Sequence, residues 1–173
     1  MGRILPLVLI VAAACASRPD LPSGVVRVSG RAPVVSGPLL TGGTFSPSAY
    51  RGRVLLVNFF NPFCLPCAEE QPVLERDWRR LHERGVEFVG IHYVGGQWPG
   101  SASAARSYLK RMGVTYPVLE DPGSRLARAF AIQGLPSSVI VDRRGRMRFR
   151  VLGRIRAGEV RDLLGRIGAP SPR

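Results

Sequence analysis

The sequence predicts an α/β fold in which helices flank a mixed β-sheet. Two short apolar runs, 53–60 and 86–94, are typical of buried strands, and an amphipathic helical pattern follows each of them. Residues 136–142 and 147–152 fit two further strands, joined by an Arg- and Gly-containing turn at 143–146. The resulting order, β-α-β-α-β-β-α, indicates one domain that combines crossover helices with an antiparallel hairpin.

Composition favours one globular domain with a basic surface. The chain has 173 residues, of which 45% are hydrophobic, and this is enough to bury a single core. The formal net charge is +13, from 25 Lys and Arg against 12 Asp and Glu. Such an excess suits an acidic partner, an anionic membrane or nucleic acid. No nucleic-acid-binding motif accompanies it, so we expect a solvated basic surface and no nucleic-acid partner.

The start of the chain is typical of an export signal. Arg3 gives a positive charge, and the apolar stretch 4–14 is shorter than the roughly 20 residues that span a bilayer. Its end, Val-Ala-Ala-Ala followed by Cys15, resembles a bacterial lipobox. We therefore expect a signal peptide at 1–14 and an exported protein on the periplasmic or cell-envelope side, anchored to the membrane by a lipidated Cys15. Ordinary cleavage after Ala14, which leaves Cys15 free, is the alternative.

The segment after the signal is rich in Pro, Gly and Ser, and it divides into a tether and the start of the domain. Residues 15–38 are predicted to be a tether, within which 25–28 fits a short edge strand. A small hairpin at 39–45 leads into the domain, which is expected to span 39–168 and to leave 169–173 as a tail.

The helices are predicted from apolar residues that recur every three or four positions. Leu74, Trp78 and Leu81 do so in a helix at about 65–84, which Gly85 ends. The other expected elements are a helix at 101–112, an extended segment at 116–119, a short helix at 124–130 and a last helix at 157–167.

A C-x-x-C motif lies where the first strand gives way to the first helix. Asn61 and Pro62 break the strand, so Cys64 falls at the N-terminus of the helix. Unpaired backbone N–H groups and the helix dipole favour a thiolate there. Cys64 is therefore the candidate nucleophile, and Cys67, one turn later, is the candidate resolving thiol.

Two other uses of the cysteine pair are possible. A zinc site needs two further ligands, and the chain offers only Cys15, His82 and His92, which form no spaced pair. A purely structural disulfide would close a loop too short to constrain the unfolded chain much. Redox chemistry is the favoured interpretation, and we expect neither a metal nor a cofactor.

Four stretches carry a resemblance to a known family. They are the run 51–59 (RGRVLLVNF), the CLPC motif followed by Glu70 and Pro72, the segment 134–145 with Gly-Leu-Pro at its start, and a helical insertion between Val94 and Tyr116. In combination they resemble the TlpA/ResA-like membrane-tethered thiol-disulfide oxidoreductases of bacteria, over about 39–155. The resemblance implies a thioredoxin fold, with a mixed central sheet flanked by helices, an N-terminal extension and a helical insertion.

The resemblance also implies a docking surface for a partner. Pro136 is expected to be a cis proline that faces the cysteine motif, and the backbone of Leu135 is expected to pair with an extended segment of the partner. Phe63 belongs to the same surface, and it stands where the family usually has Trp. Asn61 and Pro62 replace the family's usual small residues.

Three further positions are expected to set the redox properties. Leu65 and Pro66 lie between the cysteines, where they would tune the redox potential. Glu70 resembles a family acid that lies close to the active site and adjusts thiol reactivity or relays a proton. The alternative for Glu70 is an ordinary carboxylate on the helix surface.

The resemblance implies that the chain is an exported reductant that acts on protein partners. The implied partners are disulfide-containing client proteins and a membrane electron donor, and cytochrome c maturation is the commonest role in the family. A peroxiredoxin is the first alternative, but it uses a T-x-x-C context, and here Asn61 takes the place of Thr. A copper chaperone of the Sco type is the second, but it needs C-x-x-x-C and a distant His, and no His follows His92.

Overall fold

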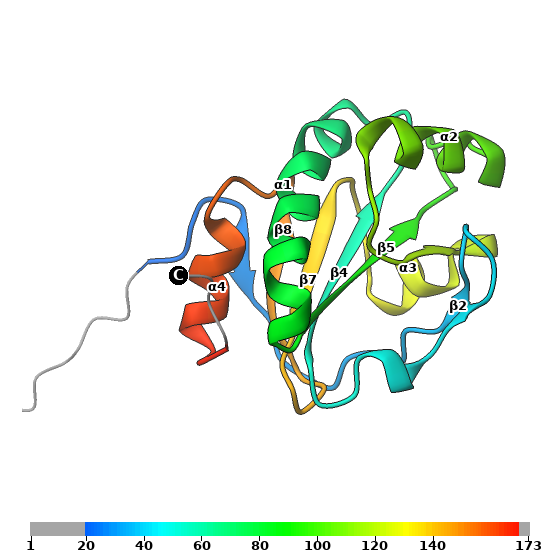
Figure 1. The fold of residues 1–173 in the computed structure, drawn as a ribbon. Coiled ribbons are helices and arrows are strands. Elements are labelled where there is room, and N and C mark those ends of the chain that lie inside the picture. The colour runs from blue at the N-terminus through cyan, green and yellow to red at the C-terminus, as the bar shows by residue number, and fades with distance from the viewer. Residues whose placement is uncertain (1–19, 170–173) are drawn as a thin grey trace, which may run out of the picture.

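The structure, a computed structural model, describes residues 20–169. The predicted signal peptide, Cys15 and most of the predicted C-terminal tail lie outside this range. Within it, helices pack on both faces of a mixed sheet (Figure 1), so the predicted fold class is confirmed. No helix of residues 20–169 is both long enough and apolar enough to cross a membrane.

The central sheet of the described chain has six strands in the order β1-β8-β7-β4-β5-β6. β4 pairs in parallel with β5 and antiparallel with β7, which makes the sheet mixed. The strands are β1 Val25–Arg27, β4 Val54–Phe60, β5 Val86–His92, β6 Val118–Glu120, β7 Ser137–Val141 and β8 Met147–Leu152. A separate two-stranded hairpin pairs β2 Gly37–Pro38 with β3 Thr44–Phe45.

Four α-helices and three short 3₁₀ turns complete the described chain. The helices are α1 Leu65–Leu81, α2 Ala102–Met112, α3 Arg125–Ala129 and α4 Glu159–Arg166. The 3₁₀ turns are η1 Pro47–Ala49, η2 His82–Arg84 and η3 Pro122–Ser124. The helical insertion implied by the resemblance is α2.

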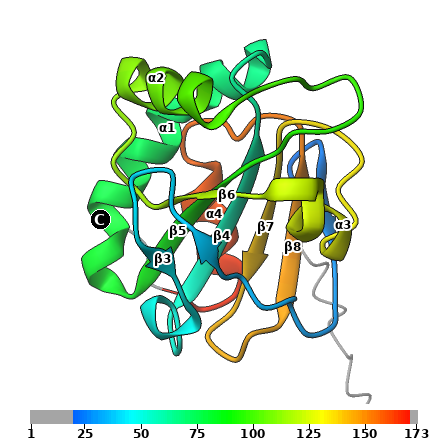
Figure 2. The same ribbon diagram turned by 90° about the vertical axis from the view of Figure 1, so that its right-hand side faces the viewer.

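β4 is an interior strand of the sheet, between β7 and β5, and all seven of its residues are buried. Its side chains alternate between the faces, as a pleated strand requires. Leu56 and Phe60 join the core under α1, α2 and α4, whereas Val57 and Phe59 join the core under α3 and the segment before β4. Figure 2 looks onto this second face, where α3 and the β2–β3 hairpin lie in front of the sheet. The apolar run seen in the sequence therefore supports two hydrophobic layers.

Most predicted elements are found within two residues of their expected limits. The expected edge strand is β1, so part of the segment assigned to the tether pairs with β8 inside the sheet. The long first helix divides into α1 and η2, and Gly85 follows in the left-handed region at φ +85°. The extended segment expected at 116–119 becomes β6, which pairs with β5 and adds a strand to the predicted order.

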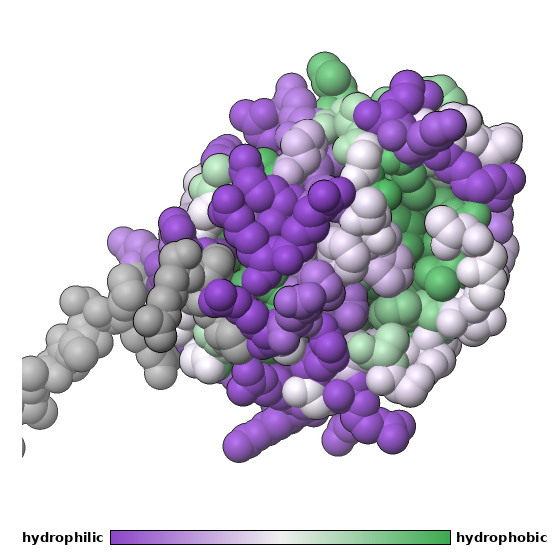
Figure 3. Space-filling model, in the orientation of Figure 1, coloured by the Kyte–Doolittle hydropathy of each residue, from purple (hydrophilic) through white to green (hydrophobic). Residues whose placement is uncertain are grey.

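The outer side of α1 is hydrophilic, as its amphipathic pattern predicts. Arg76, Arg79 and Arg80 are exposed, while Leu74 and Leu81 are fully buried. Figure 3 shows this face: hydrophilic residues gather over α1 and α4, and hydrophobic residues gather to the right of α1, below α2.

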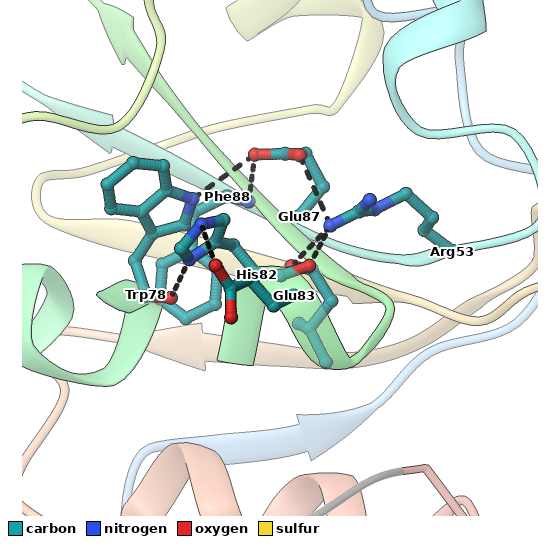
Figure 4. Close-up of polar contacts among 7 residues, drawn as sticks. Arg53, Trp78, His82, Glu83, Glu87 and Phe88 are labelled. Atoms are coloured by element: carbon teal, nitrogen blue, oxygen red, sulfur yellow. Dashed lines mark hydrogen bonds and ion pairs between the residues drawn. The ribbon is translucent and has the colours of Figure 1, made fainter. Parts of the chain in front are cut away.

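The C-terminal end of α1 is fastened to the sheet by polar contacts (Figure 4). The Trp78 indole N–H donates to the Glu87 carboxylate at 3.2 Å, and Arg53 forms an ion pair with the same carboxylate at 3.6 Å. The His82 ring stacks on Trp78, with ring centroids 4.6 Å apart. Trp78 is therefore a packing residue, and these contacts fix the axis of the helix whose other end carries the cysteines.

Candidate active site

The cysteine motif lies at the N-terminus of α1, as predicted. Cys64 is the N-cap residue, with an extended backbone at φ −94° and ψ 106°, and its sulfur accepts the Cys67 backbone N–H at 3.2 Å. The two cysteines form a disulfide with an S–S distance of 2.05 Å. The site is thus shown in its oxidised state, which holds neither thiol nor thiolate.

Both cysteines are buried, but their neighbours are not. Cys64 is 1% exposed and Cys67 is 0% exposed, whereas Phe63 and Leu65 are 62% and 72% exposed. Pro66 is exposed as well. Contiguous exposed apolar surface is a common feature of sites that contact other proteins. Phe63 and Leu65 therefore present apolar surface on either side of Cys64 in the chain.

Glu70 is fully buried, so the alternative of a surface carboxylate is wrong. One carboxylate oxygen accepts the Asn58 side-chain amide at 2.7 Å, and the other accepts the Ile155 backbone N–H at 2.8 Å. Burial raises the pKa of Glu70 to about 7, and the nearby Glu159 carboxylate acts in the same direction. The hydrogen bonds from Ile155 and Asn58 lower the pKa but do not cancel the effect of burial.

The hydrogen bonds that Asn58 and Ile155 make to Glu70 could not be predicted from the sequence. Asn58 lies on β4, and its amide also donates to the Ser138 hydroxyl on β7 at 3.0 Å. Ile155 comes from the loop that precedes α4. Of the two, only Asn58 stands out in the sequence, because it is a polar residue inside an otherwise apolar strand. The position of Ile155 depends on tertiary packing between residues 85 apart in the chain.

The Leu135–Pro136 peptide bond is cis, as the resemblance implies. Ser137 is paired with Phe59, so Pro136 lies beside the end of β4, a few residues before Cys64. Pro136 is buried, and its carbonyl accepts the Gly153 N–H at 3.0 Å. Leu135 is half-buried, and within residues 20–169 its backbone N–H and C=O make no hydrogen bond. A free stretch of backbone therefore lies close to the cysteine motif.

The predicted site residues thus come together, except Cys15, which is outside the described residues. The two histidines considered for zinc lie at opposite ends of β5, because His82 precedes the strand and His92 ends it. The two cysteines of the motif are bonded to each other in the disulfide.

Comparison with known proteins identifies the family. Residues 28–150 match the model of the AhpC/TSA family. The chain belongs to the AhpC/TSA family. Among curated members similar to it, the thiol:disulfide interchange protein HelX of Rhodobacter capsulatus is 32% identical over 103 residues, which are 59% of this chain and 53% of HelX. The thiol-disulfide oxidoreductase ResA of Bacillus subtilis is 26% identical over 120 residues, 69% of this chain and 64% of ResA.

Solved structures of this kind show the same fold. A thiol:disulfide interchange protein of the thioredoxin family from Chlorobium tepidum superposes with a TM-score of 0.72 at 28% identity, over 80% of this chain and 96% of that chain. The predicted resemblance to ResA-like proteins and the predicted thioredoxin fold are therefore confirmed. The matched region covers little more than half of HelX, at 53% of its length.

Proposed function

We propose that this chain is an exported thiol-disulfide oxidoreductase that reduces disulfides in client proteins. One arrangement carries the proposal: a Cys64–Cys67 disulfide at the start of α1, flanked by exposed apolar side chains and by the free backbone of Leu135. The similarity to HelX and ResA supports it.

The reaction transfers two electrons from the reduced cysteine pair to the client. The Cys64 thiolate attacks one sulfur of the client disulfide, so a mixed disulfide forms and one client thiolate leaves. Cys67 then attacks the Cys64 sulfur, which releases the second client thiolate and leaves the disulfide seen in the structure. A dithiol electron donor returns two electrons and two protons before the next cycle, and we propose a membrane reductase for this role.

Docking is assigned to the surface around the cysteines. An extended client segment pairs with the free N–H and C=O of Leu135, as an added strand pairs with the edge of a sheet. Phe63 and Leu65 supply apolar contact on the other side of the disulfide. Within this surface, Leu65 and Pro66 remain the positions predicted to tune the redox potential.

Glu70 is assigned the transfer of the proton from Cys67. It follows Cys67 by three residues on α1, so the two side chains share one face of the helix. With a pKa raised to about 7, its carboxyl group gains and loses a proton near neutral pH. Glu70 takes the proton as Cys67 attacks, and returns it when the pair is reduced again.

The test of function is reduction of insulin disulfides by the reduced protein. Catalysed insulin precipitation in the presence of dithiothreitol supports the oxidoreductase. Consumption of hydrogen peroxide without insulin reduction would instead identify a thiol peroxidase and overturn the proposal. For the cellular role, we propose that apocytochrome c is a client, whose cysteines must be reduced before haem attachment.

The exposed apolar pair should govern affinity for protein clients. We expect Phe63→Ser combined with Leu65→Ser to raise KM for insulin about tenfold, which corresponds to about 1.4 kcal/mol. This is less than the roughly 1.5–3 kcal/mol for complete burial of one apolar side chain, because a transient complex buries each side chain only in part. The melting temperature should change little because both side chains are exposed. Val34→Ser is the matched control, because Val34 is 63% exposed in a different part of the surface. Equal effects of the two variants on KM would exclude this docking role.

Membrane attachment is proposed to depend on Cys15. We expect Cys15→Ala to move the protein from the membrane fraction to the soluble fraction, because the variant cannot be acylated. Mass spectrometry of the wild-type N-terminus should show a lipid on Cys15, and Cys64→Ala should remain with the membrane. Wild-type protein that is soluble and carries an unmodified Cys15 would contradict the anchor.

A further inference from the structure

Asn61, which departs from the family pattern, ties the cysteine-bearing turn to a second loop. Its side chain is fully buried, and its amide donates to the carbonyls of Tyr93 at 2.8 Å and Pro99 at 2.9 Å. Its side-chain oxygen accepts the Phe63 N–H at 2.9 Å, and its backbone carbonyl accepts the Cys64 N–H at 3.1 Å. Both donors and the acceptor of the Asn61 side chain are therefore in use, on both sides of the turn.

The loop that Asn61 holds, residues 93–99, forms one wall of a cavity. The loop closes on itself, because the N–H and C=O groups of Gly95 and Trp98 pair reciprocally at 3.0 Å. Asn61 binds the loop at its first and last residues, so the side chain spans the base of this turn. The cavity measures about 400 Å³. The rest of its lining comes from the segment 132–135, which leads into the cis proline.

The lining of this cavity is uncharged, although the protein carries a net charge of +13. The lining residues are Tyr93, Gly95, Gly96, Gln97, Trp98, Ile132, Gln133, Gly134 and Leu135. Glycine backbone, two amide side chains and two aromatic rings offer hydrogen bonds and flat apolar surface, but no ion pair. A charged group placed here would lose hydration without gaining an opposite charge, which is unfavourable. The lining therefore suits a neutral side chain.

We propose that Asn61 is a positioning residue that locks the 93–99 loop against the redox turn, and so presets the cavity beside Leu135 for an uncharged client side chain next to the client cysteine. The proposal rests on the proposed function, because Leu135 is the docking backbone for the client. It adds a preference: clients with neutral residues beside the reacting cysteine are reduced in preference to clients with Lys or Glu there.

The test uses three disulfide-bonded peptides that differ only in the residue next to the cysteine, which is Ser, Lys or Glu. Both signs of charge are included because the net positive charge of the protein would by itself favour Glu. Bis(2-hydroxyethyl) disulfide serves as a small substrate that carries no amino-acid side chain next to its reacting sulfur. For the wild type we expect KM for the Ser peptide to be at least fivefold lower than for either charged peptide.

Asn61→Asp is the informative variant. The carboxylate keeps the bond to the Phe63 N–H but loses both donors to the loop, and it faces the Tyr93 and Pro99 carbonyls. We expect this variant to lose the preference for the Ser peptide, mainly through KM, and to lose more activity on that peptide than on the small disulfide. Trp98→Ala removes a wall of the cavity and leaves the Asn61 contacts in place, so it should lose the same preference even where Asn61→Asp folds poorly.

Thr115→Val is the control for a general loss of stability. It removes a hydrogen bond between Thr115 and Glu75 that lies outside both the loop and the cavity, and the peptide preference should survive it. If the wild type reduces all three peptides equally well, or if both site variants keep the preference, the inference is wrong while the oxidoreductase function stands. If the wild type reduces no peptide and no small disulfide, the proposed function itself fails.

Discussion

Cys64→Ser is expected to reduce insulin at the uncatalysed rate, because the serine hydroxyl does not form the thiolate that attacks a disulfide. Cys67→Ser is expected to be inactive in turnover for a different reason. Its Cys64 can attack, but the mixed disulfide is then not resolved, so covalent adducts with the client accumulate. Mass spectrometry under non-reducing conditions separates the two results.

The pair of variants also tests the order of attack. Cys64 is assigned the attack because it is the N-cap residue of α1 and lies between the exposed Phe63 and Leu65. In the oxidised structure the two cysteines are equally enclosed, so exposure alone does not distinguish them. Adducts that accumulate in Cys64→Ser instead of Cys67→Ser would reverse the assignment. The same Cys67→Ser protein, expressed in cells, should capture the natural client.

Glu70→Gln is expected to change how the stability of the oxidised protein depends on pH. In the wild type, burial raises the pKa of Glu70 from 4.5 to about 7. The folded state therefore keeps a proton that the unfolded chain has already lost, so this contribution to stability is full below pH 4.5 and is lost as pH rises through about 7. The loss amounts to about 3 kcal/mol in the free energy of unfolding.

The variant lacks this titration, because glutamine is neutral throughout. The free energy of unfolding of Glu70→Gln, relative to wild type, should therefore rise by about 3 kcal/mol between pH 4 and pH 8. Urea unfolding at several pH values measures the difference, in which the other titrating groups cancel. Glu69→Gln is the matched control, because Glu69 precedes Glu70 on the same helix but is exposed, so the variant removes a carboxylate without touching the buried one. Parallel curves for Glu70→Gln and wild type would show that Glu70 is not held protonated.

The parts of the site that follow from local chemistry could be predicted from the sequence. The sequence places Cys64 at a helix N-terminus because a strand, a break and an amphipathic pattern follow one another over a short distance. The strands 54–60 and 86–92 follow from the sequence as well, since most of their residues are apolar, which is typical of strands that are buried on both faces.

The parts that depend on long-range packing could not be predicted. The sequence does not decide whether the Glu70 side chain is exposed or buried. The groups that hydrogen-bond to it, Asn58 and Ile155, belong to other elements. The sequence shows Asn61 only as a residue that ends a strand. Its hydrogen-bond partners, the carbonyls of Tyr93 and Pro99, lie more than 30 residues away in the chain. Helical periodicity gives the side of a helix that is buried, but it does not tell which polar residue on that side finds hydrogen-bond partners there.

The segment before β4 has a consequence for self-association. β1 covers the outer edge of β8 with three residue pairs. Further along the same segment, Leu39 bridges to Leu119 and the Leu40 N–H donates to the Val118 carbonyl at 2.9 Å, so the outer edge of β6 is covered too. Uncovered edge strands present free backbone groups that recruit strands from other molecules. A fragment that begins after residue 40 would leave both edges open and would tend to stack edge to edge, even with its cysteine pair intact.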